Sequence, residues 1–309
     1  MPGSRGVGID RSAAEHFNIS ARARVDMRKK PSRVVERKVE EENRKLHDHG
    51  AHNYDNYPPY QNRQIFKHYA IDAKYIRGLF PRTPIVLDAG CGTGHLAREF
   101  IKAGCRVDVN DISPEMVRVT LARIAKLQRN TVSHTQDVNA LLERLARGKR
   151  QYDVICFSSM LHHVVDYVRS VRLAARALRP GGVIYIFGEP MWFGKGGLDR
   201  PSRFAIWASA QYINAYKAVR NPRYAVRFIR EQYLRRKSEG RPEIDIALAE
   251  YHGRTGLDHE RILRTLREER CVVVAMSKYT VHPGRVVRLL DPLLSDRSRT
   301  FKLIALKTA

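Results

Sequence analysis

The sequence predicts an α/β fold in which helices cover both faces of a mostly parallel sheet. Between residues 81 and 189, apolar runs of strand length alternate five times with segments of helical periodicity. One of these runs, at Val86, leads directly into a turn with glycine at positions 90, 92 and 94. The next apolar run ends at Asp111, about 20 residues after the turn, which is the spacing of one strand–helix–strand unit.

Each element of this region follows from an apolar run and its flanking residues. Apolar runs that end in polar residues predict the strands ending at Asp88 and Asp111, a short strand before Asp137, and strands over 152–157 and 183–187. Helical periodicity, with proline or polar residues at the starts, predicts helices over 96–103, 114–127, 139–147 and 167–178. Beyond residue 257, the pattern predicts a helix over 258–269 and two closing strands over 271–279 and 301–307.

The chain divides into an extension and one main domain. Residues 1–53 are polar and charge-rich, and we expect them to be partly disordered with a helix from Ser32 to Leu46. Residues 54–309 form the main domain, in which 190–257 lacks a convincing strand and is expected to be an inserted helical lid. Near the start of this domain, a helix should bury Ile65, Tyr69, Ile76 and Leu79 on one face.

The glycine-rich turn has the composition of a cofactor loop. Glycine leaves no Cβ between the backbone and a ligand, so a bound molecule can lie against the main chain. An acid, Asp88, ends the preceding strand, and a carboxylate at this place suits a cationic ligand better than a pyrophosphate. Taken alone, Asp111 is more typical of a helix N-cap, because Ser113 and Pro114 stand where a helix begins.

These motifs, in this order, resemble the class I S-adenosylmethionine (SAM) methyltransferases, specifically the small-molecule, methyltransferase type 11-like branch. The resemblance is carried by Val86-Leu-Asp-Ala-Gly-Cys-Gly-Thr-Gly94, Val107–Asp111, Thr135-Gln-Asp137, Tyr152–Phe157 with Ser158–His163, and Leu178-Arg-Pro-Gly-Gly182. It implies a Rossmann-like, doubly wound sheet of seven strands in the order 3-2-1-4-5-7-6. It also implies that SAM is the cofactor.

The resemblance further implies a set of site residues. The methionine end of SAM would lie against Asp88, Gly90, Cys91, Gly92 and Gly94, with Cys91 included by position only. The ribose would lie against Asp111 and Ile112, the adenine against Asp137 and Val138, and Ser158 would complete the cofactor set. A histidine is the natural base for an acceptor hydroxyl, and the catalytic candidates are His162, His163 and His252. The alternative for His162 and His163, which are adjacent at a strand end, is one buried and one solvated side chain. The alternative for His252 is a histidine that satisfies a buried backbone group. No metal site is predicted.

Charge is the second informative feature. The formal net charge is +24, and residues 200–237 hold ten Lys or Arg residues against one acid, interleaved with aromatic residues. Three interpretations stay open for this segment: a solvated helix face, an amphipathic surface for anionic lipid, and an RNA-binding surface. Tyr54, Tyr57 and Tyr60 have two interpretations, closing a cofactor pocket or packing against the sheet.

The remaining features predict a cytoplasmic enzyme, with peripheral membrane contact as an option. No apolar run approaches the ~18 residues that cross a bilayer, and the N-terminus lacks the apolar stretch of a signal peptide. The four cysteines form no CxxC pair, which predicts reduced core residues. We therefore predict a SAM-dependent methyltransferase that modifies oxygen or carbon of a small-molecule or lipid-linked acceptor. The alternatives are an RNA methyltransferase and a non-catalytic SAM-binding protein.

Overall fold

The computed structural model describes residues 32–56, 63–148, 151–192, 244–253, 255–279 and 300–308, together with the isolated positions 219 and 226. Seven strands form one sheet in the order β3-β2-β1-β4-β5-β7-β6. They are β1 Ile85–Ala89, β2 Arg106–Asp111, β3 Ser133–Thr135, β4 Tyr152–Ser158, β5 Leu178–Pro190, β6 Cys271–Tyr279 and β7 Thr300–Lys307. Strand β7 runs antiparallel to β5 and β6, and the other six strands all run in one direction. The predicted fold class and strand order are therefore confirmed.

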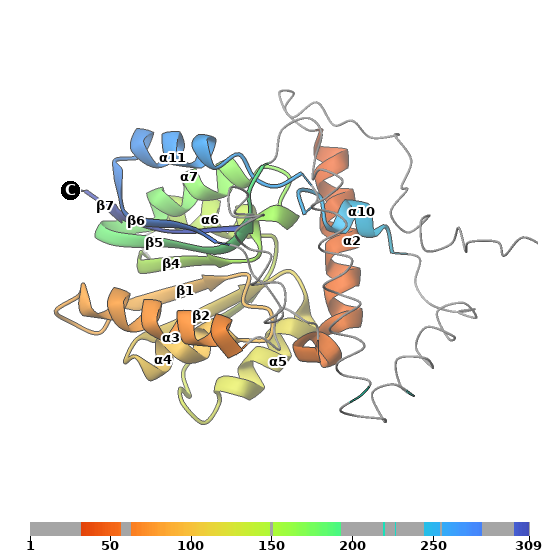
Figure 1. The fold of residues 1–309 in the computed structure, drawn as a ribbon, viewed down its shortest axis with the longest axis horizontal. Coiled ribbons are helices and arrows are strands. Elements are labelled where there is room, and N and C mark those ends of the chain that lie inside the picture. Colours follow the sequence, from red (N-terminus) through yellow and green to blue (C-terminus); the bar gives the residue numbers. More distant parts are fainter. Residues whose placement is uncertain are drawn as a thin grey trace, which may run out of the picture.

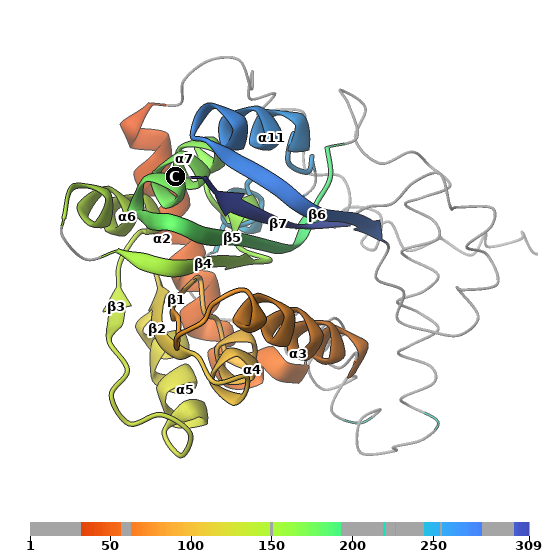
Figure 2. The same cartoon turned by 90° about the vertical axis from the view of Figure 1, so that its left-hand side faces the viewer.

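Helices cover both faces of this sheet (Figure 1). One layer holds α3 Arg63–Gly78, α4 His95–Lys102 and α5 Pro114–Ile124, and the opposite layer holds α6 Val138–Arg147, α7 Tyr167–Ala177 and α11 His259–Glu268. Figure 2 shows the same two layers on either side of the sheet edge. The helices predicted over 96–103, 114–127, 139–147, 167–178 and 258–269 are all present within a few residues of their expected bounds.

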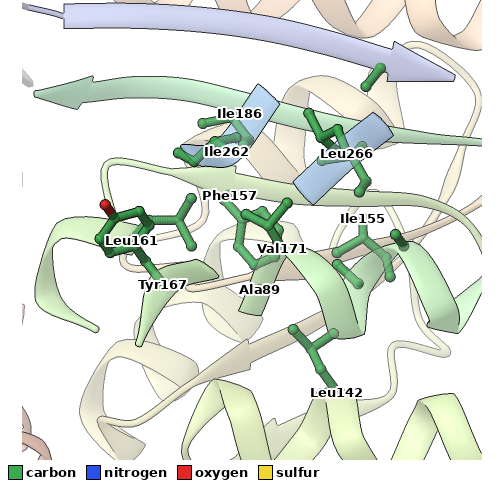
Figure 3. Packing of buried hydrophobic residues seen from close by; sticks show 14 of the residues in the cluster. Ala89, Leu142, Ile155, Phe157, Leu161, Tyr167, Val171, Ile186, Ile262 and Leu266 are labelled. Carbon is green, nitrogen blue, oxygen red and sulfur yellow. The ribbon is translucent and has the colours of Figure 1, made fainter. Parts of the chain in front are cut away.

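Two buried clusters lie on the two faces of the sheet because strand side chains alternate. On β4, Ile155 and Phe157 point into the cluster under α6, α7 and α11 (Figure 3), whereas Val154 and Cys156 join the cluster under α3 and α4. Both sets are fully buried. This alternation explains why β4 is apolar at successive positions from Val154 to Phe157, as expected for a strand covered on both sides.

The first helix of the described residues lies across the end of the sheet at which the parallel strands finish (Figure 1). This helix, α2, runs from Arg33 to Gly50 and begins at Ser32, whose hydroxyl accepts the N–H of Val35. A short 3₁₀ segment, η1 Ala51–Asn56, follows it. Figure 1 also shows α10, Ile246–Ala249, beside α2. The predicted helix from Ser32 is therefore present, and it packs on the domain.

One of the four predicted core residues of α3, Leu79, is wrong. Leu79 is 42% exposed because α3 ends at Gly78, one residue earlier. The predicted partners Ile65, Tyr69 and Ile76 are buried.

All four cysteines are free and buried, at positions 91, 105, 156 and 271, so the prediction of reduced core cysteines is confirmed. Within the described part of the chain, no helix is long and apolar enough to cross a membrane.

Most of the predicted lid lies outside the described residues, including nearly all of the basic segment 200–237. The start and the end of the lid region are described and come together. Met191, which directly follows β5, pairs with Leu257 through a single parallel bridge. The division of the chain into an extension, a main domain and a lid stays a prediction.

Candidate functional site

A pocket of about 1110 Å³, including the open solvent at its mouth, lies at the carboxyl edge of the sheet, beneath α2. The carboxyl ends of parallel strands are the usual position for a ligand in an open α/β sheet. Ten predicted site residues line the pocket: Asp88, Gly90, Cys91, Gly92, Asp111, Ile112, Asp137, Val138, Ser158 and His163. Three others, Gly94, His162 and His252, are not in its lining.

The loop after β1 brings bare backbone to the pocket. Gly90 has φ of 127°, and a Cβ there would lie 2.4 Å from the side chain of Met160, so only glycine fits. Gly92 also has a positive φ, 49°, and a Cβ there would meet only Tyr54, at 4.0 Å. Backbone atoms at Gly92 therefore face pocket space under Tyr54. Of the three tyrosines proposed to close the pocket, Tyr54 lines it, and Tyr57 and Tyr60 lie outside the described residues.

Asp88 is a buried acid without a conventional partner at the end of β1. Its side chain is 1% exposed, and neither carboxylate oxygen forms a hydrogen bond of normal geometry among the described residues. Burial raises its pKa to about 7, the negative charge of Asp111 adds to this effect, and the N–H of Ala97 opposes it. A buried carboxylate of this kind is stabilised by a cation that enters the pocket.

Asp111 connects the glycine loop to the turn after β2. One oxygen accepts the N–H of Gly92 at 2.9 Å, and the other accepts the N–H of Ser113 at 3.0 Å. The helix cap is Ser113 itself, whose hydroxyl accepts the N–H of Met116, so Asp111 is not the cap of α5. An ionised carboxylate has about four acceptor positions, so Asp111 keeps capacity for two ligand hydroxyls.

At the other end of the pocket, Asp137 and Glu40 lie close enough to repel each other. Asp137 caps α6 by accepting the N–H of Ala140 at 2.8 Å, and burial raises its pKa. Glu40 comes from α2, and its pKa is raised to about 7, first by burial and then by the charge of Asp137. This end of the pocket is therefore rich in acceptors and suits a ligand with N–H donors.

His162 lies behind the pocket and is held by Glu189, the acid at the end of β5. The fully buried carboxylate of Glu189 accepts the N–H groups of Met160 and Leu161 at 2.7 and 2.9 Å. Its second oxygen is 2.9 Å from Nδ1 of His162. Burial lowers the pKa of His162, but the hydrogen bond and charge of Glu189, with Glu250, outweigh burial and raise the pKa above its usual value.

His163 is the one histidine among the three predicted candidates that lines the pocket. Its Nδ1 is 2.8 Å from the carbonyl oxygen of Ala249, and its ring packs edge-on against His47 of α2 at 5.0 Å between centroids. Burial lowers the pKa of His163 well below its usual range, and the neighbouring His162 and His47 add to this effect. A neutral ring therefore faces the pocket.

His252 serves the backbone instead. The ring Nε2 of His252 is 3.1 Å from the carbonyl oxygen of Val165. The backbone N–H of His252 donates to the carbonyl oxygen of His162 at 2.7 Å. The side chain is buried, and burial lowers its pKa to about 4. Gly94 also has a local part: it begins α4, and a Cβ there would lie 2.9 Å from the side chain of Thr120.

The structure adds pocket residues that the sequence did not indicate. They come from α2, and they are Glu36, Val39, Glu40, Asn43 and His47. Polar residues in a charge-rich helix carry no local sign of a ligand, and only the position of α2 across the sheet reveals them. Glu189 could have been found from the sequence, because an acid that ends a parallel strand lies at the same edge as Asp88.

Comparison with known proteins places a recognisable domain over this site. Residues 87–184 match a family model described as "Methyltransferase domain". A ubiquinone biosynthesis O-methyltransferase from Xanthomonas oryzae pv. oryzae is 34% identical over 101 residues, which are 33% of this chain and 41% of that protein. The enzyme of the same name from Xanthomonas axonopodis pv. citri is 32% identical over 108 residues, 35% of this chain and 44% of that protein. The chain thus matches less than half the length of these relatives.

Solved structures give weaker similarity over more of the chain. A putative sarcosine dimethylglycine methyltransferase from Galdieria sulphuraria superimposes with a TM-score of 0.49 and 15% identity, covering 79% of this chain and 86% of that one. An N-methyltransferase from Bradyrhizobium japonicum, solved with S-adenosyl-L-homocysteine, gives a TM-score of 0.49 and 12% identity, covering 89% and 99%.

Proposed function

Since this chain contains a domain of the class I SAM-dependent methyltransferases over residues 87–184, we propose that it transfers the methyl group of SAM to oxygen of a small-molecule acceptor. The observation that carries this proposal is the pocket at the carboxyl edge of the sheet. It combines a bare glycine backbone, the buried carboxylate of Asp88 and the anchored carboxylate of Asp111.

The residues present fit SAM along the whole pocket. Asp88 supplies negative charge where a cationic ligand is needed, and SAM carries positive charge on its sulfur and its ammonium group. Asp111 would accept the ribose hydroxyls, and Asp137 the adenine amine, since each has free acceptor capacity. Bound SAM would supply an electrophilic methyl group. The chain's own contribution is to hold the cofactor and exclude water beneath α2.

The acceptor half of the proposal rests on His163 and its surroundings. His163 is a neutral ring in the pocket lining, and it can hold an acceptor hydroxyl through a hydrogen bond. His162 and Glu189 lie directly behind it and position the turn that carries both histidines. The O-methyltransferases among the relatives favour oxygen over carbon as the methylated atom. A lipid-linked acceptor is a finer variant of the same proposal.

The test follows labelled methyl from SAM into host extract separated into RNA, lipid and soluble small-molecule fractions. The wild-type chain is compared with Asp111→Ala, which removes the carboxylate that joins the glycine loop to the β2 turn. Loss of charge-assisted hydrogen bonds worth about 1.5–3 kcal/mol each should weaken SAM binding by roughly tenfold to a hundredfold. Glu115→Ala, a nearby surface change, is the matched control.

Label in the small-molecule fraction that needs Asp111 but not Glu115 supports the proposal, and label in the lipid fraction supports its lipid-linked variant. Label confined to RNA would instead favour an RNA methyltransferase that uses the basic segment 200–237. SAM binding without label in any fraction would favour a non-catalytic SAM-binding protein. Either of the last two results would overturn O-methyl transfer to a small molecule.

A further inference from the structure

We propose that His162, His163 and Glu250 bind a divalent transition-metal ion beside the pocket. One possible ligand atom from each of the three lies within 4.8 Å of the others. Nε2 of His162 and a carboxylate oxygen of Glu250 are 3.6 Å apart. These are distances that a small shift of side chains would close around an ion with ligand bonds of about 2.0–2.2 Å.

Both histidines are oriented in the way that metal-binding histidines usually are. A ligating histidine typically donates its other ring N–H to a carboxylate or a backbone carbonyl, which fixes the ring and the tautomer. Nδ1 of His163 lies 2.8 Å from the carbonyl oxygen of Ala249, and a carbonyl only accepts, so Nδ1 carries the hydrogen. Nε2 of His163 therefore keeps its lone pair for a ligand.

His162 has the corresponding arrangement with a carboxylate. Its Nδ1 donates to Glu189 at 2.9 Å, so Nε2 is the nitrogen directed toward Glu250. Glu189 is itself fixed by the N–H groups of Met160, Leu161 and His162 at 2.7, 2.9 and 3.2 Å. The carboxylate that orients His162 is thus rigid before any ion arrives, which reduces the cost of ordering the site.

The three ligands come from two segments that are far apart in sequence. His162 and His163 form the 3₁₀ turn η2, Leu161–His163, after β4, and Glu250 follows α10 at the end of the lid region. The side chain of Glu250 is 37% exposed and that of His162 is 13% exposed, so an ion can reach the site from solvent. A bound ion would join the sheet edge to the end of the lid region.

The ligand set decides the class of ion. Two imidazole nitrogens and one carboxylate suit Zn²⁺, Co²⁺, Fe²⁺ or Mn²⁺, whereas Mg²⁺ and Ca²⁺ prefer oxygen ligands alone. Three protein ligands leave at least one coordination position open. His163 lines the pocket, so this position adjoins the acceptor region. With the ion on Nε2 of His163, the acceptor hydroxyl would bind the open position of the ion in place of a direct hydrogen bond to that nitrogen. This last step rests on the proposed function, but ion binding does not.

The test is a titration of the full-length chain, without affinity tag and freed of metal by a chelator, with Co²⁺ alone. Visible absorption reports whether Co²⁺ acquires protein nitrogen ligands, and equilibrium dialysis gives the stoichiometry. Glu250→Gln removes the charged ligand at a partly exposed position, where folding should tolerate the change. Glu260→Gln is the matched control, because Glu260 lies 3.3 Å from His259 in a comparable surface pair. Circular dichroism verifies that each variant is folded.

We expect one Co²⁺ per chain, displaced by Zn²⁺, and an affinity at least tenfold lower in Glu250→Gln than in Glu260→Gln. Absence of bound Co²⁺ in the wild-type chain would overturn the proposal, as would equal affinities of the two variants. Because no SAM is present, failure here leaves methyl transfer standing. Conversely, Co²⁺ binding in a chain that transfers no methyl group would contradict the proposed function alone.

Discussion

Asp88 places a cost on the empty protein that a cationic ligand removes. Its carboxylate is 1% exposed, and burial, aided by the charge of Asp111, raises its pKa to about 7. The free acid has a pKa of about 3.9, so the folded state holds the proton more tightly than the unfolded chain does. The contribution of protonated Asp88 to the free energy of unfolding is fully present below pH 4. It declines as the pH rises toward 7, where the buried carboxyl group must ionise.

We expect Asp88→Asn to remove this decline. The free energy of unfolding of the ligand-free variant should gain about 2–4 kcal/mol relative to wild type between pH 4 and pH 8. Asp153→Asn provides a control of opposite sign. Burial raises the pKa of Asp153, but bonds from Ile85, Arg82 and Arg179 outweigh it and lower the pKa. That variant should lose stability most at neutral pH. Urea unfolding across the pH series measures both.

The raised pKa of Asp88 also predicts how the affinity for SAM depends on pH. A cation favours ionised Asp88, so wild-type affinity for SAM should rise between pH 5 and pH 8. In Asp88→Asn the affinity should be lower and this rise reduced. Calorimetric titration at several pH values checks it, and an equal rise in both proteins would show that another group controls the pH dependence.

At the scale of elements, α2 lines the pocket at the carboxyl edge of the sheet and is held in place at its middle and at its end. The buried Glu42 accepts the backbone N–H of Asp245, just before α10, at 2.7 Å. Asp48 accepts the hydroxyl of Ser113 at 2.6 Å. In η1, Asp55 pairs with Arg123 and accepts the hydroxyl of Thr93. Release of these contacts would open the pocket from the α2 side, which gives SAM a route in and out.

Breaking the central contact should loosen this helix. Glu42→Ala leaves the Asp245 N–H without its partner, at a cost of about 1–3 kcal/mol. Glu41→Ala is the matched control, because Glu41 pairs with the same Lys45 but is 54% exposed and should change stability by less than about 1 kcal/mol. Hydrogen exchange should be faster in α2 of the Glu42 variant only, and SAM should slow it. Equal exchange in both variants would contradict the role of Glu42.

At the scale of the whole molecule, one buried charge joins a helical layer to two neighbouring strands of the sheet, β5 and β7. Asp72 of α3 accepts the hydroxyl of Tyr185 on β5 at 2.8 Å, and Lys302 on β7 contacts both its oxygens at 2.8 and 2.9 Å. Asp72 is 5% exposed. The antiparallel strand β7 is thus tied to a helix that precedes the cofactor loop.

Removing this carboxylate should destabilise the domain as a unit. Asp72→Ala leaves the hydroxyl of Tyr185 and the ammonium group of Lys302 without this partner. We expect a loss of about 3–5 kcal/mol in the free energy of unfolding. Glu115→Ala, which breaks the exposed pair with Arg118, should cost less than about 1 kcal/mol. Guanidinium unfolding followed by fluorescence and circular dichroism measures both. A loss confined to one probe would show that α3 unfolds separately from the sheet.

The clustering of the predicted cofactor residues around one pocket could be predicted from sequence because its signals are local. Asp88 and Asp111 end strands, glycine 90 and 92 form the turn between them, and parallel strands bring these ends to one edge. Leu79 was wrong because the helical period continued past the last helical residue. Which catalytic candidate touches ligand stays a prediction, although the structure separates His163 from His252.

The sequence by itself determined the fold class, because periodicity and turn chemistry act within short stretches of chain, and the family resemblance of its motifs implied the strand order and the carboxylates expected to bind the cofactor. Only the tertiary structure decided that α2 closes the pocket, that Glu189 holds His162 and that Glu250 joins the two histidines. These contacts link residues 86 positions apart for His163 and Ala249, and 203 apart for Glu42 and Asp245. Their formation depends on how whole layers pack, which no local pattern encodes.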